Sequence, residues 1–113
     1  MRIKVRDTGR VQILDLDGEL KLGVGDTALR DTVKGLINTG HNNLVLNLRH
    51  VRWIDSSGMG EMVACRKRVA ERGGELKLLM PSEKIYSLLV LVRFHEYFQI
   101  HHDESQAVVS FIV

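Results

Sequence analysis

The sequence predicts a single α/β domain spanning residues 1–113, with a mixed β-sheet of four to five strands, an N-terminal hairpin and about four helices. Three observations support this prediction. A chain of 113 residues suits one domain with a conventional core. Short apolar runs of strand length alternate with segments whose apolar residues recur at helical spacing, and the chain opens with two adjacent strand patterns. Such alternation favours parallel strands joined by right-handed crossovers, so only the opening hairpin should be antiparallel.

The hairpin is predicted from two alternating runs at the start of the chain. Ile3 and Val5 alternate with charged residues, and a second run covers residues 11–17. The Thr8-Gly9 pair between the runs supplies the turn. Residues 18–20 are expected to lead into a loop over residues 21–25, whose two glycines lack the spacing of a phosphate-binding loop.

The first helix and the strand after it are predicted from caps and periodicity. Asp26 is the expected N-cap, and Gly40 is placed to end the helix. Its apolar residues recur at helical spacing: Leu29, Val33, Leu36 and Ile37. Residues 44–48 then carry apolar side chains on both faces, which predicts a central strand covered on both sides.

The second helix is expected to follow Ser57 and to end at Gly73-Gly74. Its inner stripe comprises Met59, Met62, Val63, Val69 and Ala70. The residues expected to point outward are Glu61, Arg68, Glu71 and Arg72. Arg66 falls within the inner stripe, so we expect its side chain to extend along the edge of the core or to form a salt bridge.

The remaining elements are a strand over residues 76–80, a helix capped by Ser82, a short edge strand over 98–100 and a last helix opened by a capping box at 103–106. The apolar residues of the Ser82-capped helix are Ile85, Leu88, Leu89 and Val92. Those of the last helix are Ala107, Val108 and Phe111.

The junction between the central strand and the second helix carries the candidate site. Asp55, Ser56 and Ser57 lie there, and each is able to cap a helix. A hydroxyl or phosphate at a helix N-terminus meets unpaired N–H groups and a partial positive charge. Gly58 and Gly60 keep the first turn free of bulk, which allows a partner to approach. The junction therefore reads either as a modifiable serine on a docking surface or as a plain N-cap with a spare hydroxyl.

A family resemblance rests on this junction. The segment Val45-Leu46-Asn47-Leu48, followed after a short loop by Ile54-Asp55-Ser56-Ser57-Gly58-Met59-Gly60, resembles the motif of anti-sigma-factor antagonists, whose domain is called STAS. The resemblance implies that Ser56 is phosphorylated, that Ser57 is a neighbouring cap and that Asp55 helps to shape the loop. The implied partner-binding residues are Asp55, Ser56, Ser57, Gly58, Met59, Gly60 and Lys21.

The resemblance also implies the partners. A GHKL-type serine kinase that doubles as an anti-sigma factor would be sequestered when Ser56 is unphosphorylated, which frees a sigma factor, and a phosphoserine phosphatase would reverse the modification. Lys21 departs from the family, whose members often carry an acidic residue there, and so it changes the charge of the expected partner rim. Two alternatives within the family remain open: nucleotide binding at the Ser56 loop, or service as a scaffold in a signalling assembly.

Other chemistries find little support in the sequence. A catalytic serine needs a base, but the five histidines fall in expected loops or the edge strand and the Gly-X-Ser-X-Gly elbow is absent. His101 and His102 are adjacent on a strand and so point to opposite faces, which disfavours a shared metal ion. The arginines that nucleic acid would need are interleaved with Glu61 and Glu71. We therefore expect no enzymatic activity, cofactor, metal or nucleic-acid partner.

Composition sets the expected environment. The net charge of +2 is small, and the single cysteine, Cys65, suits a reducing compartment. The N-terminus lacks the apolar core of a signal peptide, and no apolar run approaches the roughly 20 residues of a membrane span. These features predict a cytoplasmic protein without a membrane partner. The free edges of a small sheet permit a weak dimer as well as a monomer.

Overall fold

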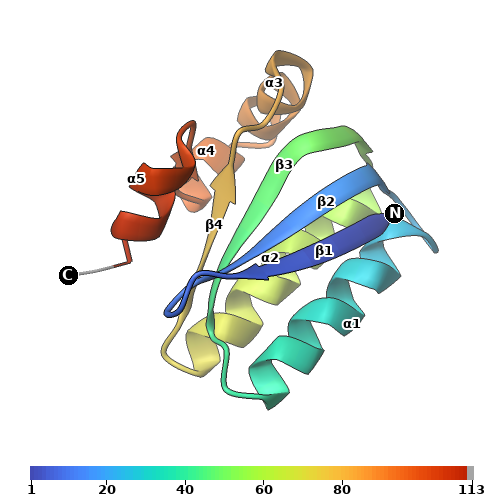
Figure 1. Ribbon diagram of the computed structural model, residues 1–113. Coiled ribbons are helices and arrows are strands. Elements are labelled where there is room, and N and C mark those ends of the chain that lie inside the picture. Colours follow the sequence, from blue (N-terminus) through green and yellow to red (C-terminus); the bar gives the residue numbers. More distant parts are fainter. Residues whose placement is uncertain (112–113) are drawn as a thin grey trace.

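The computed structural model describes residues 1–111 as one α/β domain (Figure 1). Its elements in chain order are β1 (Arg2–Asp7), β2 (Gln12–Leu20), α1 (Gly25–Asn38), β3 (Asn43–Ile54), α2 (Ser56–Glu71), β4 (Glu75–Leu79), α3 (Glu83–Leu91), α4 (Phe94–Tyr97), β5 (Ile100–His101) and α5 (Glu104–Val109).

The strands form one mixed sheet in the order β1-β2-β3-β4-β5. The β1–β2 pair is antiparallel, and each later pair of neighbours is parallel, which confirms the predicted hairpin and the predicted parallel pairing. The Thr8-Gly9 turn is also confirmed, because Gly9 adopts φ +98° and the Thr8 N–H donates to the Val11 carbonyl at 2.9 Å. Gly40 and Gly73 close α1 and α2 as expected.

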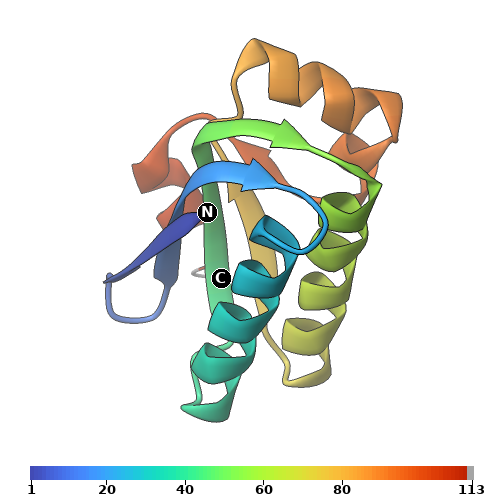
Figure 2. The ribbon, with the colours of Figure 1, turned by 90° about the vertical axis from the view of Figure 1, so that its right-hand side faces the viewer.

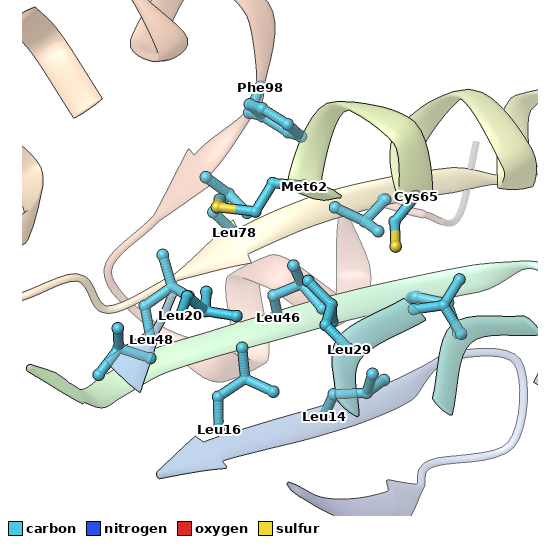
Figure 3. Packing of buried hydrophobic residues seen from close by; sticks show 14 of the residues in the cluster. Leu14, Leu16, Leu20, Leu29, Leu46, Leu48, Met62, Cys65, Leu78 and Phe98 are labelled. Carbon is cyan, nitrogen blue, oxygen red and sulfur yellow. The ribbon is translucent and has the colours of Figure 1, made fainter. Parts of the chain in front are cut away.

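Helices cover both faces of the sheet. The long helices α1 and α2 lie side by side on one face, and α5 covers part of the other, while α3 lies over one end (Figures 1 and 2). The central strand β3 packs against helices on both faces of the sheet, as predicted. Leu44, Leu46 and Leu48 join the main core beneath α1 and α2, whereas Val45 packs with Ala107 of α5 on the opposite face. Figure 3 shows the main core, including Met62 and Cys65 from α2.

Strands β2 and β3 are both longer than the sequence indicated. Residues 18–20, which were expected to follow the strand, and the expected loop after Leu48 are instead strand, because the two extensions pair with each other: Gly18 with Val51 and Leu20 with Ile54. Register shifts interrupt this pairing, and only Val51 and Ile54 are buried among the last six residues of β3. The extended parts of the strands therefore lack the regular alternation of apolar and polar residues by which a strand is predicted from sequence.

The first helix and the C-terminal elements also differ from expectation. Helix α1 has Val24 rather than Asp26 at its N-cap, and the Asp26 carboxylate accepts from Gly23 N–H at 2.9 Å from within the first turn. Helix α4 was not predicted. The edge strand starts at Ile100 rather than at residue 98, because Phe98 is buried at the end of α4. Helix α5 ends at Val109, before Phe111.

The predicted caps of the later helices are confirmed. Ser82 accepts from the Ile85 N–H at 3.2 Å, and Asp103 accepts from the Gln106 N–H at 2.9 Å. The predicted face of the Ser82-capped helix is wrong at one position, because Val92 is the C-cap and is exposed.

The faces of α2 required two corrections. Glu61 was expected to point outward but is 6% exposed, and Ala70 was expected to point inward but is exposed. Glu61 is buried because Arg30 of α1 reaches across to it at 2.8 Å, an interaction that periodicity within α2 cannot reveal. The expectation for Arg66 is confirmed, since its guanidinium lies 4.0 Å from the centre of the Tyr97 ring at the edge of the core.

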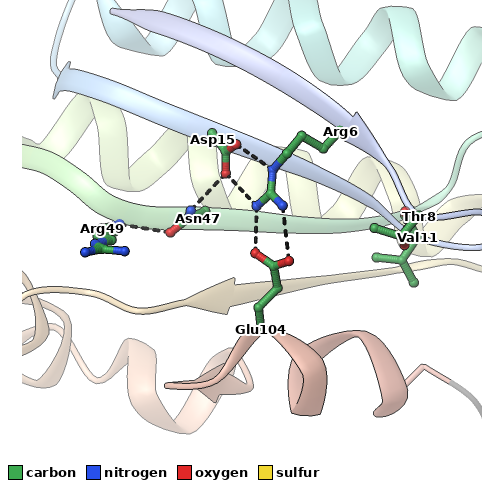
Figure 4. Close-up of polar contacts among 7 residues, drawn as sticks. All are labelled: Arg6, Thr8, Val11, Asp15, Asn47, Arg49 and Glu104. Carbon is green, nitrogen blue, oxygen red and sulfur yellow. Dashed lines mark hydrogen bonds and ion pairs between the residues drawn. The ribbon is translucent and has the colours of Figure 1, made fainter.

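An ion-pair network fastens α5 to the sheet (Figure 4). Arg6 of β1 donates to Asp15 of β2 at 2.6 Å and to Glu104 of α5 at 2.7 Å. Asn47 of β3 donates to the same Asp15 carboxylate at 2.8 Å. The polar face of three strands is thus linked to the first turn of the last helix.

Candidate functional site

The candidate site lies where the end of β3 meets the start of α2. The helix begins at Ser56, and Asp55 is its N-cap with extended backbone. Ser57 was implied to be a cap, but it lies within the first turn of the helix instead. Only one residue can occupy the N-cap position, and Asp55 does so because its carboxylate accepts the Gly58 N–H at 2.9 Å.

Asp55 also joins the helix start to a distant loop. Its second carboxylate oxygen accepts the backbone N–H of Leu22 at 3.0 Å, and its own N–H donates to the carbonyl of Leu20 at 3.0 Å. Hydrogen bonds from the Gly58 and Leu22 amides lower the pKa of the Asp55 carboxyl below its usual value. The site therefore combines the α2 N-terminus with the β2–α1 loop.

The two glycines of the motif differ in their surroundings. A Cβ added to Gly58 would overlap the carbonyl oxygen of Leu20, so this position accepts no side chain without movement. Gly25, at the start of α1, approaches the end of β2 in the same way, beside the carbonyl of Glu19. Gly60 has no neighbouring heavy atom within 4 Å of an added Cβ. Gly58 is thus explained by packing within the domain, whereas Gly60 leaves an open surface.

The other residues predicted for the site lie around this surface. Ser56 and Gly60 are exposed, Ser57 is half-buried, and Met59 packs partly against the main core. Lys21 is half-exposed in the β2–α1 loop and pairs with Glu19 at 3.4 Å. It directly precedes Leu22, whose backbone N–H donates to Asp55, and it therefore lies beside the motif. The structure therefore brings all seven predicted residues to one end of the sheet.

Two apolar residues of the site were missed by sequence reasoning. Leu22 and Val24 of the β2–α1 loop have exposed fractions of 72% and 45%. The hydrogen bond from the Leu22 N–H to Asp55 holds this loop beside the serines. The sequence signal that could have identified them is the presence of apolar residues in a glycine-containing loop, where they are not needed to form the core. They extend the candidate surface from the polar helix start onto an apolar rim suited to a protein partner.

The arrangement presents a hydroxyl to solvent at the positive end of a 16-residue helix. Ser56 is exposed and lies outside the main core, so a group attached to its hydroxyl would meet solvent. Within residues 1–111, no three His, Cys, Asp or Glu side chains gather into a candidate metal site. The described helices include none with the length and apolar character needed to cross a bilayer.

This combination of an α/β fold and an exposed serine junction agrees with one known domain family. Residues 2–107 match the family model of the STAS domain, so the chain belongs to the STAS-domain family. A Thermotoga maritima protein named as a candidate anti-sigma factor antagonist is 32% identical over 71 residues, which span 63% of this chain and 63% of that protein. The match thus covers just under two thirds of that relative's length.

Solved structures agree with the family assignment. A crystal structure of a candidate anti-sigma factor antagonist from Thermotoga maritima has a TM-score of 0.88 and 26% identity, covering 96% of this chain and 93% of that chain. The anti-sigma factor antagonist SpoIIAA matches in its unphosphorylated form with a TM-score of 0.71 at 20% identity, covering 95% and 94%. Its phosphorylated form, from Bacillus, matches with a TM-score of 0.72 at 19% identity, covering 95% and 96%.

Proposed function

We propose that this protein is an anti-sigma factor antagonist whose binding to its partner is controlled by phosphorylation of Ser56. The observation that carries the proposal is the position of Ser56. This residue is the first of α2, directly after the Asp55 cap, and it is exposed. The names of the relatives support the antagonist role, and the two forms of SpoIIAA support a phosphorylation switch in this family.

The proposed partner is an anti-sigma factor that is also a GHKL-type serine kinase, and a phosphatase restores the free serine. The protein itself acts as a binding module rather than an enzyme. Its docking surface comprises Asp55, Ser56, Ser57, Gly58, Met59, Gly60 and Lys21, extended by Leu22 and Val24. The hydrogen bonds of Asp55 support this grouping, because they hold the β2–α1 loop against the start of α2.

Physical magnitudes favour a switch at the interface over a change of fold. A phosphate adds about −1.5 to −2 charges, and its attraction to a helix N-terminus contributes only about 0.3–1 kcal/mol. A like-charge or steric conflict at a docked surface costs several kcal/mol, and about 1.4 kcal/mol already changes affinity tenfold. The similar TM-scores to the two forms of SpoIIAA are consistent with a fold that tolerates the modification.

The test is phosphosite mapping by mass spectrometry after incubation of the purified protein with ATP and an extract of its host. We expect phosphate on Ser56 in the wild type and in Ser57→Ala, and none in Ser56→Ala. The bound anti-sigma factor should then be released from the phosphorylated protein but retained by Ser56→Ala. Phosphate on Ser57 alone, or equal partner binding by both forms, would overturn the proposal.

A further inference from the structure

A narrow cleft lies along the first half of β4, on the side of the sheet away from the β1–β2 hairpin (Figure 1). This β4 cleft has a volume of about 280 Å³, and it is lined by Arg66 and Ala70 of α2, by residues 74–77, and by Tyr97 and Gln99. At 1.5 Å per residue, Arg66 lies about 15 Å along α2 from Ser56. The β4 cleft is therefore separate from the proposed phosphorylation site.

The first half of β4 has an unpaired edge at this cleft. Strand β5 pairs only with Leu78 and Leu79, and the Leu78 N–H donates to the Gln99 carbonyl at 2.9 Å. Backbone groups alternate in direction along a strand, so the N–H and C=O of Leu76 point to the same side, where no strand lies. Leu76 is nevertheless only 3% exposed. Because an unpaired backbone group costs free energy when it is buried, this edge favours a ligand that brings its own backbone partners.

One cation in the β4 cleft has no counter-charge. The guanidinium of Arg66 lies 4.0 Å from the centre of the Tyr97 ring, and in the described part of the chain it forms no ion pair. The other two charged lining residues neutralise each other, since the Lys77 ammonium lies 3.2 Å from the Glu75 carboxylate. The same ammonium donates to the Ser110 carbonyl at the end of α5. The aromatic contact thus holds the half-buried Arg66 in the cleft while its N–H donors remain available for an anion.

We propose that the β4 cleft binds an extended acidic segment of a partner protein, which adds a short strand beside β4 and places a carboxylate on Arg66. The N–H and C=O of Leu76 supply the backbone pairing by which a peptide extends a sheet. The guanidinium of Arg66 matches a glutamate or aspartate carboxylate with two parallel hydrogen bonds. The volume lies just below the usual range of small-molecule sites and suits a single side chain, which favours a peptide over a free metabolite.

The test is an ¹⁵N–¹H NMR titration of the full chain with a short capped peptide that carries a central glutamate between valines. We expect saturable shifts concentrated at residues 74–78 and at Arg66. Replacement of the glutamate by glutamine should weaken binding about tenfold, and so should Arg66→Gln with the original peptide. Lys67→Gln removes an exposed cation of α2 outside the cleft, so this matched control should leave the affinity unchanged.

Hydrogen exchange tests the strand pairing independently of Arg66. In the free protein, the Leu76 amide should exchange faster than the Leu78 amide, which donates to Gln99. The glutamate peptide should slow exchange at Leu76. The same peptide with prolines in place of the valines lacks N–H donors and should bind more weakly.

The remaining outcomes would overturn the proposal. Absence of saturable shifts, or equal affinity for the glutamate and glutamine peptides, would exclude recognition of an acidic segment by Arg66. Equal weakening by Lys67→Gln would show that binding reflects general charge. If free glutarate binds as tightly as the peptide, the ligand is a small carboxylate and no strand is added. Thermal unfolding of Arg66→Gln verifies that the variant remains folded, and the comparison between peptides on the wild-type protein does not depend on it.

Discussion

The carboxylate of Asp55 accepts a hydrogen bond from the backbone N–H of Leu22 at 3.0 Å, across 33 positions of sequence. The same carboxylate caps α2 through Gly58. One side chain therefore positions both the helix that carries Ser56 and the loop that carries Lys21 and Leu22. A change at Asp55 should disturb the whole docking surface and not only the helix cap.

Asp55→Ala should lower the melting temperature at neutral pH, because the amides of Gly58 and Leu22 lose their acceptor. The folded-state pKa of Asp55 is below its unfolded value, so its contribution is fully present above about pH 4 and disappears as pH falls through the folded pKa. The difference in melting temperature between variant and wild type should therefore shrink below about pH 4. A difference that is constant from pH 7 to pH 3 would contradict this assignment.

Gly58→Ala and Gly60→Ala should have opposite effects on stability. Alanine at 58 collides with the Leu20 carbonyl, and such overpacking costs about 1–3 kcal/mol. Alanine at 60 meets open space within a helix and should raise the free energy of unfolding by about 0.5–1 kcal/mol. Urea unfolding measures both. Equal effects of the two substitutions would contradict the close approach of α2 to β2 at Gly58.

Glu61→Gln should destabilise the domain by about 2 kcal/mol. Glu61 bridges Arg30 of α1 and Arg68 of α2, at 2.8 and 2.6 Å, and is 6% exposed. Although burial opposes ionisation, the hydrogen bonds from Arg68 and Arg30 lower the pKa of its carboxyl. Glu71→Gln on the exposed face of the same helix is the control and should change stability by less than about 0.5 kcal/mol in urea unfolding.

Cys65 should be unreactive in the folded protein. Burial, with the nearby Glu61 charge, raises the pKa of its thiol to about 12, so thiolate is scarce at pH 8. A disulfide reagent should label Cys65 only after unfolding in urea, at the rate of global opening. Rapid labelling of the native protein would show that α1 and α2 separate readily.

Phosphorylation of Ser56 should leave the fold unchanged. The residue is exposed and precedes the buried positions of α2, so a phosphate meets solvent and the helix N-terminus rather than the core. Circular dichroism spectra of the two forms should superimpose, and the melting temperature should stay level or rise slightly. A large loss of helical signal on phosphorylation would contradict an interface-based switch.

Several features were predictable because their signals are local. The hairpin turn at Thr8-Gly9, the caps at Ser82 and Asp103, and the alternation of strands with helices all depend on a few adjacent residues. The Asp-Ser-Ser-Gly motif is local too, and it located the exposed serine at the start of α2. Lys21 was associated with the site only through the family resemblance, since no local pattern connects it to residue 55.

The sequence by itself therefore determined the order and type of most elements and the position of the serine junction, because periodicity and capping operate within one or two turns of chain. Tertiary structure decided the extension of β2 and β3, the burial of Glu61 and the gathering of Arg66, Leu76 and Tyr97 around one cleft. Each of these depends on a partner from a distant segment: a neighbouring strand, Arg30 or the ring of Tyr97. Backbone pairing and charge burial are properties of such contacts, and residue order along a single element does not encode them.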